Sequence, residues 1–164
     1  MARGGRTLLA LVVAGIALFG VSPEASATNV VEARTLTTEE ESLVDALNRA
    51  RIARGIAPVR VGLRLQRAAR AHSRAMARSG FFGHGNWYRR LRSFGVRGQT
   101  VGETIAWGAG SQGTASSIVG MWLASPPHRA TILGRSFRRV GVGIAVGTME
   151  GYSGAQVATA DFSS

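Results

Sequence analysis

The chain has 164 residues, no cysteine, and 20 basic against 9 acidic residues, for a formal net charge of +11. Without cysteine the fold is held by packing alone, and disulfides, a cysteine zinc site and a thiol nucleophile are excluded. Every basic residue is arginine. A basic domain suits contact with anionic lipid, envelope polymer or nucleic acid, whereas codon bias in a GC-rich genome explains the choice of arginine over lysine more simply. The net charge attracts polyanions weakly in either case.

The first 27 residues have the pattern of a secretory signal peptide. Arg3 and Arg6 give a positive segment, residues 8–19 are apolar, and Ala25-Ser26-Ala27 is a small-x-small cleavage pattern. The apolar run is too short to span a bilayer comfortably, so secretion after cleavage at Ala27 is favoured over an N-terminal membrane anchor.

The rest of the chain is long enough for one domain with one core, over residues 38–164, after a flexible lead-in over residues 28–37. Thr38-Glu39-Glu40-Glu41 is a capping box with its carboxylates at the positive end of the helix dipole. It predicts a first helix over residues 39–54, with Gly55 just beyond its end.

A second helix is predicted over residues 63–79, because arginines recur every three or four residues opposite an apolar face. We interpret this stripe as a solvated helix face rather than a binding surface. His72 lies on the apolar side and is interpreted as a core histidine outside the site. The stripe comprises Arg64, Arg67, Arg70, Arg74 and Arg78.

Each of the other two histidines stands at a predicted helix boundary. Glycines flank His84 and leave one face of its imidazole uncrowded. Asn86 is expected to cap a short helix over residues 87–94, and another helix is predicted over residues 114–124. Pro126-Pro127 ends that helix, so His128 begins a further short one, with Ser125 as its N-cap.

The period changes near residue 140, where residues 140–146 and 155–162 read as two antiparallel strands. A further strand is possible over residues 104–107. Helices first and strands last predict an α+β fold with helices packed on a small sheet, not a βαβ fold.

His84, Glu103 and His128 are the candidate site residues. Imidazole is the commonest protein metal ligand and the usual proton carrier near neutral pH, so two histidines and a carboxylate suit a metal site or an acid–base site. Their spacing alone does not bring them together. No P-loop, His-Glu-x-x-His pair, Gly-x-Ser-x-Gly elbow or recognised nucleic-acid module is present, so no specific nucleic-acid binding is expected.

Several segments, in order, resemble the CAP superfamily of cysteine-rich secretory, antigen 5 and pathogenesis-related 1 proteins, also called SCP domains, and the match resembles its short bacterial members. The resemblance covers roughly residues 43–162. Its motifs are Leu47-Asn48-Arg49-Ala50-Arg51, His72-Ser73, Phe82-Gly83-His84, Gly102-Glu103-Thr104-Ile105-Ala106, Met121-Trp122, Ser125-Pro126-Pro127-His128-Arg129 and Gly141-Val142-Gly143.

The resemblance implies an α-β-α sandwich, with helices flanking a largely antiparallel central sheet, and a cleft lined by His84, Glu103 and His128. It implies His84 and His128 as ligands of Zn²⁺ or another divalent metal. Glu103 would be an orienting group, a third ligand or a base for bound water.

Two positions depart from the family pattern. Thr104 replaces the usual asparagine, and the second acid that many eukaryotic members carry shortly after the residue matching Trp122 is missing. The expected tetrad is therefore a triad, which does not support a two-carboxylate mechanism.

Three functions are compatible with these residues. The favoured one is a secreted module that binds a lipid, sterol or other apolar or cell-envelope ligand in the cleft. Its binding would depend on a divalent metal where the histidines hold one. A hydrogen-bonded His/Glu network without metal or chemistry ranks second. A metal-assisted hydrolase or peptidase on an extracellular or envelope substrate, with Glu103 as the catalytic residue, ranks third. The arginine-rich surface suits peripheral membrane or anionic polymer contact.

Overall fold

The computed structural model describes residues 35–164. The predicted signal peptide and most of the predicted lead-in therefore lie outside the described residues. Within the described part, none of the helices has the length and apolar character needed to cross a membrane.

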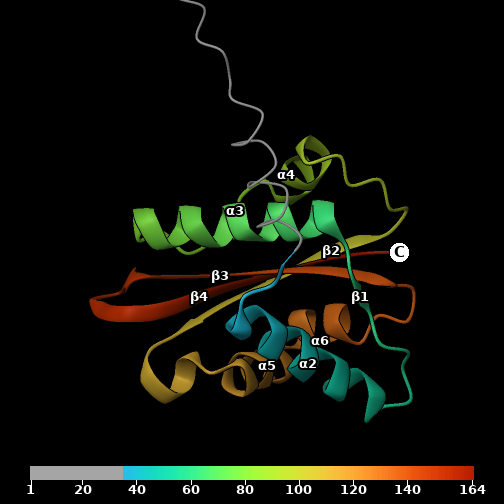
Figure 1. Cartoon of the computed structure of the whole chain (residues 1–164), viewed down its shortest axis with the longest axis horizontal. Helices are drawn as coiled ribbons and strands as arrows, with labels where there is room; N and C mark the ends of the chain where they lie inside the picture. Colours follow the sequence, from blue (N-terminus) through green and yellow to red (C-terminus); the bar gives the residue numbers. More distant parts are fainter. Residues whose placement is uncertain (1–34) are drawn as a thin grey trace, which may run out of the picture.

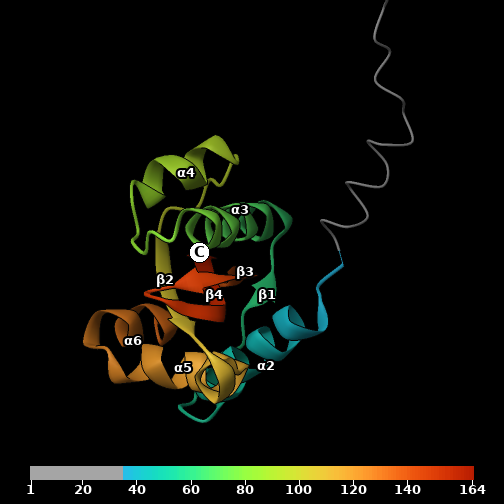
Figure 2. The same cartoon turned by 90° about the vertical axis from the view of Figure 1, so that its left-hand side faces the viewer.

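The described chain forms three layers, with a four-stranded sheet between two layers of helices (Figures 1 and 2). Helices α3 and α4 cover one face of the sheet, and α2, α5 and α6 cover the other. The predicted α-β-α sandwich is confirmed. In chain order the elements are α2 (Thr38–Ile52), β1 (Arg60–Val61), α3 (Leu63–Ser79), α4 (Trp87–Ser93), β2 (Val101–Gly108), the 3₁₀ turn η1 (Gly110–Gly113), α5 (Ala115–Ala124), α6 (Pro126–Ile132), β3 (Arg139–Met149) and β4 (Tyr152–Ser163).

The sheet has the order β1-β3-β4-β2, which leaves β2 at one edge. Strands β3 and β4 form the predicted antiparallel hairpin, β2 pairs antiparallel with β4, and the two-residue β1 pairs parallel with β3. Met149 pairs with Tyr152 across the turn, where Glu150 and Gly151 both have positive φ. Two such residues give the hairpin turn whose twist matches the strands.

The start of α2 corrects one prediction. Thr37, not Thr38, is the N-cap: its hydroxyl accepts from the backbone N–H of Glu40, whose carboxylate in turn accepts from the N–H of Thr37. Both threonines have a glutamate three residues on, but Glu40 is buried and also pairs with Arg70 of α3. That tertiary contact selects the register, and it removes Arg70 from the predicted solvated stripe.

The two helical layers approach the sheet differently. On the α2, α5 and α6 side the core is apolar and continuous, with Leu47, Trp122, Val142 and Phe162 fully buried. On the other side α3 lies almost directly on β3, because that strand presents glycine to it: a Cβ at Gly141 would lie 2.0 Å from the carbonyl carbon of Leu65. This close approach brings the polar side chains of β2 and β4 within reach of α3 and α4.

Candidate functional site

Glu103 lies on β2 with its side chain on the α3 and α4 side of the sheet. The residue is 7% exposed. Three side chains surround its carboxylate: His84 from the loop after α3, Arg90 from α4 and His72 from α3. A buried carboxylate needs such partners because burial without them is costly.

His84 reaches Glu103 from a loop that two glycines shape. Gly80 ends α3 with φ +67, and Gly85 has φ +56. Nδ1 of His84 lies 2.7 Å from Oε1 of Glu103, and the carboxylate accepts the hydrogen bond. The neutral imidazole therefore carries its proton on Nδ1 and keeps a free lone pair on Nε2.

Arg90 occupies the second oxygen of Glu103. This guanidinium comes from α4, which Asn86 caps by accepting from the N–H of Arg89. Arg90 donates to Oε2 of Glu103 and to the backbone oxygen of His84, the latter at 3.3 Å. Burial lowers the Arg90 pKa from its usual value, and Asp161 opposes this effect. Both oxygens of Glu103 are thus engaged.

Asp161 is a second carboxylate in the same layer. It is fully buried on β4, directly opposite Glu103 in the strand register, and 3.7 Å from a guanidinium nitrogen of Arg90. Neither of its oxygens has a hydrogen-bond partner in the described part of the chain. Burial raises the pKa of Asp161 to about 7, against the lowering effect of Arg90. The group therefore titrates near neutral pH.

His72 lies on α3 beside Glu103, and 11% of its side chain is exposed. Its Nε2 is 4.0 Å from Oε2 of Glu103 and has no hydrogen-bond partner among the described residues. Burial, and then the charge of Arg90, lowers the His72 pKa to about 4. The side chain faces the interior as predicted, but it belongs to the surroundings of the site rather than to a remote core.

His128 is the third residue of α6 and faces His84 across the edge of the sheet. Ser125 is the N-cap as predicted, but its hydroxyl makes no capping bond, and Pro126 and Pro127 occupy the first two helical positions. The two imidazole centroids are 5.7 Å apart. Burial lowers the pKa of both histidines, and for His84 the charges of His128 and Arg90 add to the effect. Both rings are therefore neutral near pH 7.

A cleft of about 270 Å³ lies beside the edge strand β2. Its lining is mostly apolar and comes from the loop after α3, from β2, and from α5 and α6. The lining residues are Phe82, Ile105, Ala106, Trp107, Met121, Trp122, Ser125 and His128. The structure thus brings the three predicted site residues together, but of these only His128 lines the cleft.

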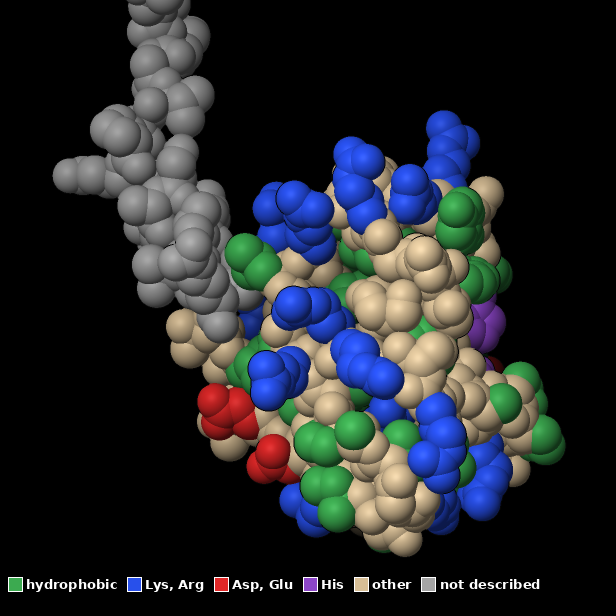
Figure 3. Space-filling model, turned by 90° about the vertical axis from the view of Figure 1, so that its right-hand side faces the viewer, with side chains coloured by type: hydrophobic (Ala, Val, Ile, Leu, Met, Phe, Trp, Pro, Cys, Tyr) green, Lys and Arg blue, Asp and Glu red, His purple; other side chains and the backbone are tan. Residues whose placement is uncertain are grey.

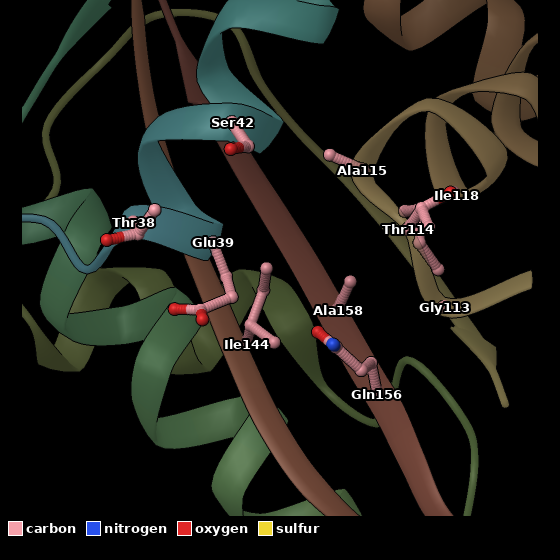
Figure 4. Close-up of a pocket in the computed structure, with 10 residues that line it drawn as sticks. All are labelled: Thr38, Glu39, Ser42, Gly113, Thr114, Ala115, Ile118, Ile144, Gln156 and Ala158. Atoms are coloured by element: carbon pink, nitrogen blue, oxygen red, sulfur yellow. The ribbon is translucent and has the colours of Figure 1, made fainter. Parts of the chain in front are cut away.

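A smaller cavity of about 150 Å³ lies away from the histidines, between the starts of α2 and α5 and the paired strands (Figure 4). Figure 4 shows Glu39 and Thr38 at one side, Thr114 at the other, and Ile144 between them on β3. Because it holds one exposed carboxylate and no histidine, we do not assign it a role in the site.

Arg90 and Asp161 were not predicted as site residues from the sequence, and His72 was set apart. Asp161 had a usable signal: the predicted antiparallel strands place an acid on β4, and correct register puts it opposite Glu103. Arg90 gave no such signal, since it is one of several arginines in α4.

The residues present fit a metal held by two histidines. Nε2 of His84 is free and His128 lies beside it, whereas Glu103 is fully engaged and orients His84, as a carboxylate beside a ligating histidine does. Within residues 35–164, no group of three or more histidine, aspartate or glutamate side chains is placed to hold an ion.

The three-layer sandwich and the order of its motifs define a CAP, or SCP, domain. The chain belongs to the CAP (cysteine-rich secretory protein) family, whose model matches residues 44–162. It is 32% identical over 114 residues to the uncharacterized protein YkwD of Bacillus subtilis (strain 168). The alignment covers 66% of this chain and 43% of YkwD, so the chain spans less than half the length of that relative.

Solved structures share the fold. An outer surface protein from Borrelia burgdorferi superposes with a TM-score of 0.66 at 15% identity, over 79% of this chain and 95% of that one. An extracellular protein containing an SCP domain from Bacillus anthracis str. Ames gives a TM-score of 0.58 at 22% identity, over 79% and 44%. At these identities the likeness concerns the fold alone.

Proposed function

We propose that this CAP domain binds an apolar ligand, such as an acyl chain, a sterol or another envelope lipid, in the cleft along β2. The observation that carries the proposal is a mostly apolar cleft with the imidazole of His128 in its lining and the imidazole of His84 beside it. The apolar walls suit the hydrocarbon part of the ligand, and the histidines suit its polar group.

The size and mouth of the cleft support a lipid. Its volume of 270 Å³ is near the lower end of small-molecule pockets, about 300 Å³, which suits one chain or ring rather than a large polar substrate. Phe82 lines the cleft and is 37% exposed, and two further exposed aromatic side chains lie on the same loop and on α4: Phe81 at 67% and Tyr88 at 55%. Exposed apolar side chains of this kind favour contact with an apolar surface.

We further propose that His84 and His128 hold a divalent metal such as Zn²⁺, with Glu103 orienting His84. When bound, the metal would supply a Lewis acid that attracts an anionic head group. The lowered pKa values of both histidines support this proposal, because ligand imidazoles must be neutral.

The metal proposal is tested by calorimetry with Zn²⁺ near neutral pH. We expect His84→Ala and His128→Ala to abolish binding and Glu103→Gln to weaken it by about 10- to 100-fold, as loss of an orienting carboxylate does. His72→Gln is the matched control, since it removes an imidazole near Glu103 that is not one of the two proposed ligands. Unchanged binding in His84→Ala and His128→Ala would overturn the proposal.

The alternative function is a metal-assisted hydrolase or peptidase with Glu103 as the base. The contacts of both Glu103 oxygens favour a binding role, because they direct the carboxylate toward His84 and Arg90. Metal-dependent turnover that Glu103→Gln abolishes would favour the enzyme.

Ligand binding is tested by extraction of a fluorescent fatty acid and of a labelled sterol from neutral vesicles. Met121→Glu places a charge in the cleft and is expected to reduce extraction at least tenfold. Val146→Glu is the matched control, because Val146 is 67% exposed and does not line the cleft. Equal extraction by the two variants would place the ligand elsewhere, and no extraction by the unsubstituted chain would end the lipid proposal.

We also propose that the chain is exported, on the strength of the pattern in residues 1–27. Amino-terminal sequencing of protein from the culture medium is expected to begin at Thr28. An intact N-terminus in the membrane fraction would identify an anchor instead.

A further inference from the structure

A second cavity lies at the opposite end of α3 from the histidine loop. It has a volume of about 390 Å³, larger than the cleft, and forms where α3 begins, where the loop between α4 and β2 passes, and where β4 ends. Figure 3 shows this side of the molecule, on which arginine side chains gather and carboxylates appear only at the margin. None of the residues assigned to the histidine site lines it.

Three arginines from three elements line the cavity, which we call the arginine pocket. Arg64 is in the first turn of α3, Arg97 is in the loop before β2, and Arg139 is the first residue of β3. Arg64 is held across the pocket by a 2.9 Å hydrogen bond to the backbone oxygen of Gly95, and the Arg139 side chain packs over Gly62.

These cations have no anionic partner within residues 35–164. The arginine ion pairs of that part of the chain involve Arg70 and Arg90 alone. Ser164 also lines the pocket. The three guanidinium groups of the arginine pocket thus lack an ion-pair partner among the described residues.

Neutral donors also converge on the arginine pocket. The N-cap of α3 is Gly62, which provides no capping side chain, and the first turn has no acid. The first helical bond runs from the N–H of Gln66 to the oxygen of Gly62, so the preceding N–H groups lack helical acceptors. Ser163 lines the pocket, is 5% exposed, and its hydroxyl makes no hydrogen bond to the described residues.

We propose that the arginine pocket binds a phosphate group. Guanidinium groups pair with phosphate oxygens in a bidentate manner, and helix N-terminal N–H groups add donors on one side. A tetrahedral anion uses donors from several directions, as the three arginines, the α3 terminus and Ser163 provide. Arg60 and Arg138 line an adjoining cavity that shares Arg139, which extends the positive potential beyond the pocket.

The phosphate could be carried by a phospholipid head group or by a soluble phosphate ester, and two arms of one experiment distinguish these sources. In the first, glycerol phosphate is titrated into the full chain at constant ionic strength and followed by amide NMR shifts. In the second, binding to vesicles of phosphatidylglycerol in phosphatidylcholine is measured by sedimentation. We expect shifts at Leu63 to Leu65 and at Arg97 in the first arm if the source is soluble.

The discriminating variant is Arg97→Gln with Arg139→Gln. Loss of two charge-assisted contacts is expected to weaken phosphate binding by about tenfold or more per arginine. The control is Arg74→Gln with Arg78→Gln, which makes the same charge change on exposed α3 positions outside the pocket. Full binding by the control and loss in the pocket variant supports the proposal.

The remaining outcomes are also decisive. Vesicle binding alone, lost in the pocket variant, assigns the phosphate to head groups, whereas binding in both arms includes soluble esters. Equal weakening by both double variants would mean attraction by net charge, and no binding in either arm would overturn the proposal outright. The arginine pocket and the cleft share no lining residue, so a loss of binding in the pocket variant is not explained by the cleft.

Discussion

The two faces of the sheet are built from different side chains. Toward α2, α5 and α6, strands β3 and β4 present Val140, Val142, Ala160 and Phe162, all fully buried. Toward α3 and α4 the alternate positions of the same strands present glycine, threonine and aspartate, and Ser73 of α3 donates to the oxygen of Gly143 at 2.8 Å. The apolar face supplies most of the burial, and the polar face places charges at defined positions.

The same contrast holds for two buried arginines. Arg51, on the apolar side, donates to four backbone oxygens after α2 and α6 and has no carboxylate partner in the described chain. Arg90, on the polar side, contacts two carboxylates. Arg51 thus holds backbone segments together, whereas Arg90 pairs with the carboxylates of the candidate site.

The largest expected effect on stability comes from adding a side chain at Gly141, where α3 lies directly on β3. Gly141→Ala would place a Cβ 2.0 Å from the Leu65 backbone, which cannot yield as a side chain can. We expect a loss of about 4 kcal/mol or more in the free energy of unfolding, measured by urea denaturation.

Gly120→Ala is the control for that substitution. Gly120 is exposed in α5 and a Cβ there meets nothing within 4 Å, so alanine is expected to stabilise the protein by about 0.5 to 1 kcal/mol. A mild effect of Gly141→Ala would show that α3 adjusts to the sheet and that the close approach is not a constraint.

On the apolar face, Leu47→Ala is expected to cost about 3 kcal/mol in unfolding free energy, because Leu47 is fully buried in the continuous core. Because Leu47 lies on the opposite face of the sheet, we expect its loss to leave the geometry of the histidine site unchanged. The ¹⁵N shifts of the His84 ring should still indicate a proton on Nδ1. A changed tautomer would mean that the two faces are coupled.

On the polar face, Arg90→Met is expected to cost about 2 kcal/mol, less than a fully buried pair would because Arg90 remains partly exposed. Here the site should change, since Glu103 loses the partner of one oxygen and the His84 ring shifts should respond. Arg89→Met, on the same helix but exposed, is the control and is expected to change neither quantity.

The α+β class was predictable from the periodicity of the sequence, and the resemblance to the CAP superfamily added the three-layer arrangement. The 3.6-residue period of residues 63–79 and the alternation after residue 140 fix which elements form and which sides are apolar. Family motifs then indicated that His84, Glu103 and His128 belong to one site. Helix ends were predicted to within a residue or two because their caps are local.

What could not be predicted depends on contacts between distant segments. The N-cap is Thr37 because Glu40 pairs with Arg70 of α3. The periodicity of a single helix does not predict such a contact between two helices. The family pattern suggests a second acid after Trp122, whereas the structure supplies Asp161 through strand register. The contact of His72 with Glu103 could not be predicted either. A helical period shows which side of α3 carries His72, but not which residue of the sheet lies opposite it.

The smallest expected effect concerns pH and separates Asp161 from His72. Asp161 has a pKa raised from 3.8 to about 7 by burial, so the folded state binds more protons and the unfolding free energy falls as pH rises from about 4 to 7. His72 has a pKa lowered from 6.5 to about 4, so the unfolded state binds more protons and the same free energy rises with pH over about 4 to 6.5. The two effects oppose each other.

Single variants should therefore expose slopes of opposite sign in urea denaturation between pH 4 and 7. Asp161→Asn is expected to make stability rise with pH more steeply than in the unsubstituted chain, by on the order of 1 to 2 kcal/mol over the interval. His72→Gln is expected to make it rise less or fall, because only the lowered pKa values of His84 and His128 then oppose Asp161. Parallel pH profiles in the two variants would contradict the raised pKa of Asp161 and the lowered pKa of His72.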